Sequence, residues 1–253
     1  MVKKIFYLFG FIFLLIFTFF IFNKKNQEKI NNKTFYLTQK TEEIGEILLP
    51  QPTKILPDGL PNKHLISTVF VPQAPEKNWD QPWQDSCEEA ALLTVDYYYK
   101  NQQPSLDQTK TDILKMIDFE KSQGWAKDIN TTQMAILSSN YLNYKTNIVT
   151  NPTIEEIKKY ISQNIPVIVP ANGKTLYKEN RYFKSGGPYY HSVVILGYND
   201  NIQKFIVHDV GTQFGAYFKY SYNLLLESNH DFPKSDIKED IDSGPRNMLV
   251  LLK

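Results

Sequence analysis

The chain has 253 residues, of which 42% are hydrophobic, and 28 basic and 27 acidic residues give it a formal net charge of +1. This length is enough for one large domain or two small ones. Such a balanced charge provides no strongly basic surface, so we do not expect a nucleic acid as partner. The single cysteine, Cys87, excludes an intramolecular disulfide framework.

The first element predicted along the chain is a transmembrane helix. Residues 5–22 form an unbroken apolar run in which Gly10 and Thr18 are the least apolar members, and such a run is long enough to span a bilayer. No small-residue cleavage site follows it, so residues 1–25 are predicted to be an uncleaved signal anchor. Lysines flank the run on both sides, so the positive-inside rule does not decide its orientation. We expect a single-pass protein of the cell membrane with its large domain outside the cytoplasm, the usual outcome for such an anchor.

A polar segment separates this predicted anchor from the rest of the chain. Residues 26–63 are rich in lysine, asparagine, glutamine and proline, which is typical of a linker or stalk. Short strands are possible within it at residues 36–38 and 46–49. Residues 64–253 are predicted to form one domain, which starts with a strand over 65–71.

Helices dominate the first half of this domain and strands dominate the second. A helix is predicted from Cys87 to Lys100, and three more begin at a Ser, Asn or Thr followed three residues later by Gln or Glu, a capping-box pattern. The two predicted strands that flank Asp200 carry β-branched apolar runs, and the glycine-containing segment 171–187 is predicted to be a loop beside the site. Helices followed by an antiparallel sheet indicate an α+β fold. The further helices are 105–119, 130–142 and 153–164, and the strands are 165–171, two flanking Asp200, 217–222 and 247–252.

Cys87 lies at a chemically special position, the first residue of its predicted helix. Ser86 is a good N-cap and Glu89 completes a capping box. The helix dipole favours a thiolate there, so we expect a lowered pKa for Cys87. Glu88 and Glu89 are interpreted as charges at the helix terminus. A lone cysteine is more often a small core residue, so a catalytic role requires a histidine and an orienting acid elsewhere.

Such a pair is predicted in the hairpin that flanks Asp200. If the turn is centred on that residue, His191 lies directly opposite Asp209, and the two side chains share a face because both numbers are odd. Directly opposed Cβ atoms are about 5 Å apart. Asp209 can then hold one imidazole nitrogen and leave the other for a thiol, which is the logic of nucleophile, base and orienting group.

The other three histidines are weaker candidates for the base. His208 is expected to point to the opposite face of the strand, and His64 and His230 are expected at the surface. One cysteine and scattered histidines provide no converging set of ligands. We therefore expect neither a metal site nor a cofactor.

Aromatic residues lie beside both halves of the predicted site. Trp79 and Trp83 precede Cys87, and Tyr189 and Tyr190 precede His191. All four are candidates for lining a substrate cleft. For the two tryptophans the alternative is that they fix the loop by burial.

The order of Cys, then His at the start of a strand, then Asp at the end of the next strand resembles papain-like cysteine peptidases. More narrowly, it resembles the double-glycine, bacteriocin-processing cysteine peptidases and their stand-alone bacterial relatives. The resemblance extends from about residue 64 to the C-terminus. The matching segments are Val71-Pro-Gln73-Ala-Pro, Trp79, Cys87-Glu-Glu-Ala90, His191-Ser-Val-Val-Ile-Leu-Gly197-Tyr198 and Asp209-Val-Gly211-Thr.

This resemblance implies a papain-like fold in which helices pack on an antiparallel sheet. It implies that Cys87 is the nucleophile, His191 the base and Asp209 the orienting residue. The family also uses a glutamine upstream of the cysteine as an oxyanion donor. Gln73 is favoured for this role because its flanking residues match, and the alternatives are Gln81 and Gln84.

The sequence therefore predicts a membrane-anchored cysteine peptidase that acts on a peptide or protein through a thioester intermediate. The same three residues also serve other acyl transfers, so an amidase or a transglutaminase-like enzyme is an alternative. A non-catalytic peptide-binding module on the same fold is a second alternative, and a purely structural membrane-tethered domain is a third.

Overall fold

The computed structural model describes residue 55 and residues 59–253. The chain divides into two units, 1–52 and 53–253, and only the second contains described residues. The predicted anchor, residues 1–25, and most of the predicted linker, with its possible strands at 36–38 and 46–49, lie outside them. Among the residues that are described, no helix combines the length and hydropathy needed to cross a membrane.

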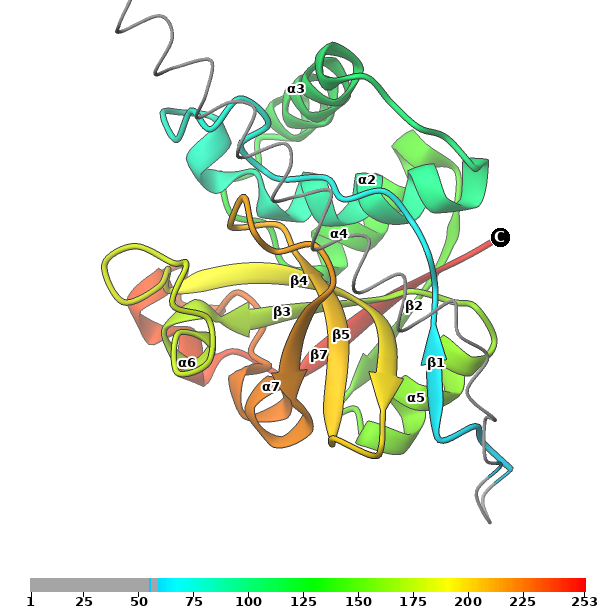
Figure 1. Cartoon of the computed structure of the whole chain (residues 1–253). Helices are drawn as coiled ribbons and strands as arrows, with labels where there is room; N and C mark the ends of the chain where they lie inside the picture. Colours follow the sequence, from blue (N-terminus) through cyan, green and yellow to red (C-terminus); the bar gives the residue numbers. More distant parts are fainter. Residues whose placement is uncertain (1–54, 56–58) are drawn as a thin grey trace, which may run out of the picture. The chain divides into compact units, whose positions relative to one another are not determined.

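The described residues form one antiparallel sheet with helices packed against it (Figure 1). The strand order is β2-β7-β3-β4-β5-β6, and β1 pairs with β4 beyond the end of β3. Mixed helices and an antiparallel sheet confirm the predicted α+β class. The strands are β1 Lys63–Leu65, β2 Lys145–Thr150, β3 Val167–Asn172, β4 Tyr190–Asn199, β5 Lys204–Asp209, β6 Phe218–Ser221 and β7 Asn247–Leu252.

Burial explains which strands could be predicted from the sequence. Every residue of β3 is buried, and so is almost every residue of β4 and β7, because these central strands are covered on both faces. The continuous apolar runs of these three strands predicted them from the sequence. The edge strand β2 alternates between exposed and half-buried residues, and its polar run was not predicted.

Helices lie on two sides of the sheet. In Figure 1, α2 and α3 lie above it, and α5 and α7 lie below. Three predicted helix starts are confirmed, because the side chains of Ser105, Asn130 and Thr153 each accept a backbone N–H of the first turn. The helices are η1 Trp83–Asp85, α2 Cys87–Lys100, α3 Leu106–Ser122, α4 Thr131–Leu137, the π-helix η2 Ser138–Leu142, α5 Ile154–Ser162, α6 Gly173–Leu176, α7 Tyr222–Ser228 and η3 Lys238–Ser243.

Two segments differ from the predictions. The strand expected over 65–71 is reduced to β1, which ends at Leu65. Beyond it the chain is held through side chains, since the Tyr217 hydroxyl bonds both the N–H and the carbonyl of Thr68. The segment 171–187, predicted to be a loop, begins within β3 and contains α6.

Helix α2 forms the centre of the core. Every residue from Cys87 to Tyr97 is buried, and the helix contacts both α3 and β4. A helix that is apolar around most of its circumference is stable only inside a protein. This packing fixes the start of α2, and with it Cys87, against the strand that carries His191.

Candidate active site

The start of α2 differs from the predicted capping box. Helix α2 does begin at Cys87, but Ser86 makes no side-chain cap, and its hydroxyl donates to the carbonyl of Pro82 at 2.9 Å. The predicted helix is therefore confirmed and its predicted cap is wrong. Cys87, the first residue of α2, lines a pocket.

Two acidic residues that follow the cysteine are also placed differently. Glu88 and Glu89 were interpreted as charges at a helix terminus, but both are buried. Glu88 turns back to the cysteine, and the Cys87 thiol donates to its Oε2 at 2.9 Å. Its Oε1 accepts the backbone N–H of Ile129, also at 2.9 Å.

These surroundings reverse the expected titration of the thiol. Burial raises the pKa of Cys87 well above its usual value, and the carboxyl groups of Glu88, Asp128 and Glu89 raise it further. The expectation of a lowered pKa is therefore wrong for this resting arrangement. The helix dipole does favour a thiolate, but a buried sulfur beside carboxyl groups experiences larger opposing effects.

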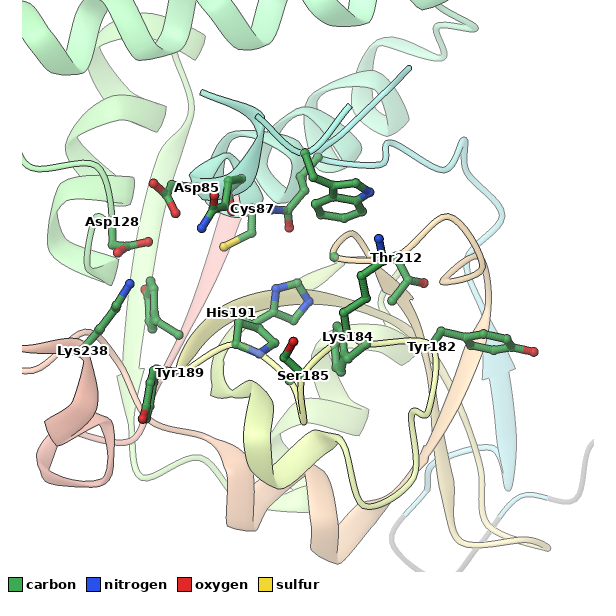
Figure 2. A pocket seen from close by; sticks show the side chains of 18 of the residues that line it. Asp85, Cys87, Asp128, Tyr182, Lys184, Ser185, Tyr189, His191, Thr212 and Lys238 are labelled. Carbon is green, nitrogen blue, oxygen red and sulfur yellow. Dashed lines mark hydrogen bonds between the residues drawn. The ribbon is translucent and has the colours of Figure 1, made fainter. Parts of the chain in front are cut away.

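A pocket of about 530 Å³ lies between the start of α2 and the start of β4, and both Cys87 and His191 line it. Cys87 lies on its helical wall and His191 on its sheet wall, and Figure 2 shows the two side chains across it. Asp85, Asp128 and Lys238 lie toward one end, and Lys184, Tyr182 and Thr212 toward the other. The pocket therefore extends to both sides of the cysteine and histidine.

His191 and Asp209 meet, although their register differs from the prediction. Next to the turn, Gly197 pairs with Ile206, and this register alone would place an even-numbered residue of β4 opposite Asp209. A β-bulge between Ile195 and Gly197 shifts the pairing by one residue, so that Val193 faces Asp209. His191 therefore lies diagonally from Asp209 on the same face. The prediction that they are directly opposed is wrong, but Nε2 of the imidazole still lies 2.7 Å from Oδ1 of the carboxylate.

Asp209 is held by several hydrogen bonds in a fully buried position. Its Oδ2 accepts from Asn180 at 2.8 Å and from the hydroxyl of Tyr220 at 2.5 Å. Its Oδ1 accepts from the backbone N–H of Gly211 as well as from His191. Burial by itself would raise the pKa of Asp209, but the charge of His191 and these hydrogen bonds outweigh it and hold the pKa below its ordinary value.

The imidazole of His191 is confined by its neighbours. The ring of Phe183 packs edge-on against it at a centroid distance of 5.3 Å. Gly211 lies on it so closely that a Cβ there would be 2.5 Å from Cε1. With Nε2 bonded to Asp209, Nδ1 is the ring nitrogen that remains for the pocket. None of Asn180, Tyr220, Phe183 and Gly211 was identified as a site residue from the sequence, because they come from separate loops and strands.

The three candidate glutamines have different positions. Gln73 and Gln84 line the pocket with Cys87, whereas Gln81 does not and donates to Asp85 at 2.7 Å. The Gln73 side chain is buried, and its amide group donates to the carbonyls of Trp83 and Gln84 at 3.1 and 2.9 Å.

The four candidate aromatic residues also differ in whether they line the pocket. Trp79, Tyr189 and Tyr190 line the pocket. Trp83 does not, and it packs against the hydrophobic core, which corresponds to the alternative of fixing the loop by burial. The hydroxyl of Tyr190 donates to the carbonyl of Ile129 at 2.9 Å.

The other histidines lie away from the pocket. His208 is buried between the rings of Phe70 and Tyr217. His64 contacts Asn164, and His230 contacts the carbonyl of Gly244. Within residue 55 and residues 59–253, no group of three or more His, Cys, Asp or Glu side chains is arranged to hold a metal ion.

A family model described as the Peptidase_C39 like family matches residues 69–231, which is more than half of the chain and includes Cys87, His191 and Asp209. The chain belongs to this Peptidase_C39 like family. Membership supports a cysteine peptidase, a hydrolase, and implies a peptide or protein substrate. It also confirms the resemblance that the motifs around Cys87, His191 and Asp209 indicated.

Solved structures resemble this member of the Peptidase_C39 like family at low sequence identity. The crystal structure of a protein from Bacillus anthracis described as a C39-like peptidase is 16% identical, with a TM-score of 0.50 over 76% of this chain and 98% of that one. Xylellain, a cysteine protease from Xylella fastidiosa, is 15% identical, with a TM-score of 0.43 over 77% of this chain and 87% of that one. Among curated proteins, none matches the chain. At 16% identity, the first likeness supports the fold alone.

Proposed function

We propose that the protein hydrolyses peptide bonds with Cys87 as nucleophile, His191 as general base and Asp209 as the residue that orients the base. The observation that carries this proposal is that Cys87 and His191 line one pocket while Asp209 holds His191 from behind at 2.7 Å. Three groups in this order match the general requirements of nucleophilic catalysis. Family membership supports the same reaction class.

The proposed reaction starts from a thiol, because the surroundings of Cys87 disfavour its charged form. Nδ1 of His191 accepts the proton as the sulfur attacks the substrate carbonyl. Asp209, which stays ionised, stabilises the resulting imidazolium. The imidazolium then gives the proton to the leaving amine, and the C–N bond breaks to leave a thioester. Water activated by His191 hydrolyses this thioester and restores the thiol.

The oxyanion requires hydrogen-bond donors near Cys87. The backbone N–H of Cys87 at the start of α2 is one candidate, and the amide of Gln73 is the other. Gln73 donates to the carbonyls of Trp83 and Gln84, so this role requires that one amide proton turns to the substrate. Trp79, Tyr189 and Tyr190 are proposed to contact the peptide, because all three line the pocket.

A trapped thioester tests this proposal directly. The full-length protein is incubated with a proteome-derived peptide library and quenched in acid, and both cleaved peptides and protein adducts are identified by mass spectrometry. We expect peptide cleavage and an acyl adduct on Cys87 that hydroxylamine removes, since thioesters are intermediates of this mechanism.

Cys87→Ala is the control for that experiment, and it should give neither products nor adduct. Equal cleavage by Cys87→Ala and wild type would contradict the proposal. Peptides that bind to the wild-type protein without cleavage would instead support a peptide-binding module. Transfer of the acyl group to an added amine would support the transglutaminase-like alternative.

We also propose that residues 1–25 anchor the protein in the cell membrane with the peptidase domain outside the cytoplasm. The support is the apolar run 5–22, which is long enough to span a bilayer. If so, protease added to intact cells, after any outer envelope layer is permeabilised, should digest the domain while a cytoplasmic marker stays intact. Protection of the domain until the cells are lysed would contradict this orientation.

A further inference from the structure

The carboxyl group of Glu88 is in direct contact with the proposed nucleophile. Its Oε2 lies 2.9 Å from the sulfur of Cys87, and its side chain is fully buried. The contact is not that of a solvated charge at a helix end. It is fixed by the loop before α4, because Oε1 accepts the backbone N–H of Ile129 at 2.9 Å.

This pair of contacts assigns a different role to each oxygen. Oε1 faces an N–H donor, so it must act as an acceptor in either protonation state. When Glu88 is a neutral acid, its proton therefore belongs on Oε2, which faces the sulfur. When Glu88 is ionised, Oε2 can only accept, and it accepts a hydrogen bond from the Cys87 thiol.

We propose that Glu88 is a second catalytic group at the sulfur: its neutral form donates a hydrogen bond from Oε2 to the Cys87 thiolate, and its ionised form accepts a hydrogen bond from the thiol and so holds the sulfur in its inactive, protonated state. This inference rests on the proposed function, because it requires Cys87 to be the nucleophile. Hydrogen bonds that involve an ionised partner are roughly twice as strong as neutral ones, so the donor form favours the thiolate.

The neighbours of Glu88 make the neutral form available. Burial and then the carboxyl of Asp128 raise the pKa of Glu88 well above its usual range. Burial and Asp85 in turn raise the pKa of Asp128 to about 6, while Lys238 and Lys127 act in the opposite direction.

Two other titratable groups lie near Glu88. Glu89 follows it on α2, and Tyr190 approaches from β4. Burial raises the pKa of both, with Glu88 among the further causes. On the opposite wall of the pocket, His191 becomes positively charged when it takes the thiol proton. The charges that bear on Glu88 from its own side are thus carboxyl groups, and they disfavour its ionisation.

Glu88 keeps its proton throughout the reaction. The thiol proton passes to His191 as the S–C bond forms, and from there to the leaving amine as the C–N bond breaks. When water cleaves the thioester, the S–C bond breaks and its electron pair returns to sulfur. Oε2–H of Glu88 then donates to this thiolate until His191 returns to the sulfur the proton that it took from the water.

The inference predicts an alkaline limit to activity. Glu88 is neutral below its raised pKa, where it donates, and ionised above it, where it withholds the thiol. kcat/KM should therefore fall as the pH rises through the pKa of Glu88, since this parameter reports groups of the free enzyme.

Glu88→Gln separates the two forms, because its amide Nε2 can donate to sulfur while Oε1 keeps the Ile129 bond. The test measures two quantities across pH: kcat/KM for a peptide cleaved by the wild type, and the rate of Cys87 alkylation by iodoacetamide, which reports one thiol because the chain has one cysteine. We expect Glu88→Gln to be more active than a Glu88→Leu variant at every pH, because it keeps a donor to sulfur, and to move the alkaline limit up by about one pH unit or more. The rate of Cys87 alkylation in Glu88→Gln should also stay unchanged up to this higher pH.

Glu89→Gln is the matched control, since it removes the adjacent buried carboxyl but not one that bonds sulfur. Because Glu89 disfavours the ionisation of Glu88, the alkaline limit of this variant should not move up. Glu88→Leu, which has no donor, should lower kcat/KM about 10-fold or more at all pH values. If Glu88→Leu does not fold, the alkaline limit of Glu88→Gln decides alone.

A Glu88→Gln variant as inactive as Cys87→Ala, or one with the alkaline limit of the wild type, would overturn the inference. Wild-type activity in Glu88→Leu would overturn it as well. Failure of the proposed function looks different, because Cys87→Ala itself would then cleave the peptide.

Discussion

Replacing His191 by alanine is expected to lower kcat/KM for a cleaved peptide by about 10³-fold or more. General bases contribute roughly 10² to 10⁴-fold, and no second histidine of the described residues lines the pocket. Among the described residues, the other histidines lie outside the pocket, with His208 enclosed by Phe70 and Tyr217. The loss should appear mainly in kcat, since His191 acts on the reacting sulfur rather than on the rest of the peptide.

The matched control for this prediction is His64→Ala. His64 is half-buried on β1 and contacts Asn164 away from the pocket lining, so its loss should change kcat/KM less than about 2-fold. Thermal unfolding of both variants separates lost chemistry from lost folding. A His191→Ala enzyme within 10-fold of wild type, equally folded, would show that another group takes the thiol proton.

Asp209→Ala should have a smaller effect than His191→Ala, because Asp209 acts only through the imidazole. The distances support this order, since Asp209 lies behind His191 and does not line the pocket. Its loss would also leave the hydroxyl of Tyr220 and the amide of Asn180 without their buried acceptor. Part of the measured change would therefore come from reorganisation of these groups.

Local pattern was sufficient to place the elements that carry the site. The apolar run after Cys87 predicted α2 from its first residue, and continuous apolar runs predicted β3, β4 and β7. These signals are strong because the elements are buried on most sides, so nearly every position is apolar. The polar edge strand β2 lacks such a signal.

The contact of His191 with Asp209 was predicted correctly, but the strand register from which it was predicted was wrong. The expected register placed the two residues opposite each other, and the observed one places Val193 opposite Asp209. These registers differ by two residues, which preserves the shared face. The bulge between Ile195 and Gly197 returns the side chains of His191 and Asp209 to the same face of the sheet. Neither the position of this bulge nor the length of the turn can be predicted from the alternation of β-branched residues.

Several side-chain contacts around the site could not be predicted from the sequence. Ser86 was expected to cap α2, but its hydroxyl donates to Pro82 instead. Glu88 was interpreted as a charge at the helix terminus, but it is buried, and Ile129, 41 residues later, supplies a hydrogen-bond donor to it. Asn180 and Tyr220 reach Asp209 from 29 and 11 residues away. Single-sequence patterns report local periodicity and capping, and they do not report which loops meet.

Gly211→Ala is expected to reduce kcat/KM by about 10²-fold while leaving the fold intact. A Cβ at Gly211 would lie 2.5 Å from Cε1 and 3.0 Å from Nε2 of the His191 ring. The ring cannot simply retreat, because Phe183 packs on it and Asp209 holds Nε2 at 2.7 Å. A displacement of about 1 Å in a reacting group can cost about 10²-fold in rate.

The source of this effect is steric, because the backbone of Gly211 does not adopt the left-handed conformation. Gly124→Ala provides the converse control: Gly124 has a φ of +70° but open space around it. That variant should lose about 1 kcal/mol of stability through backbone strain and keep its kcat/KM. If Gly211→Ala retained kcat/KM within about 3-fold, the position of the His191 ring would not limit the reaction, and the orienting role proposed for Asp209 would lose its main support.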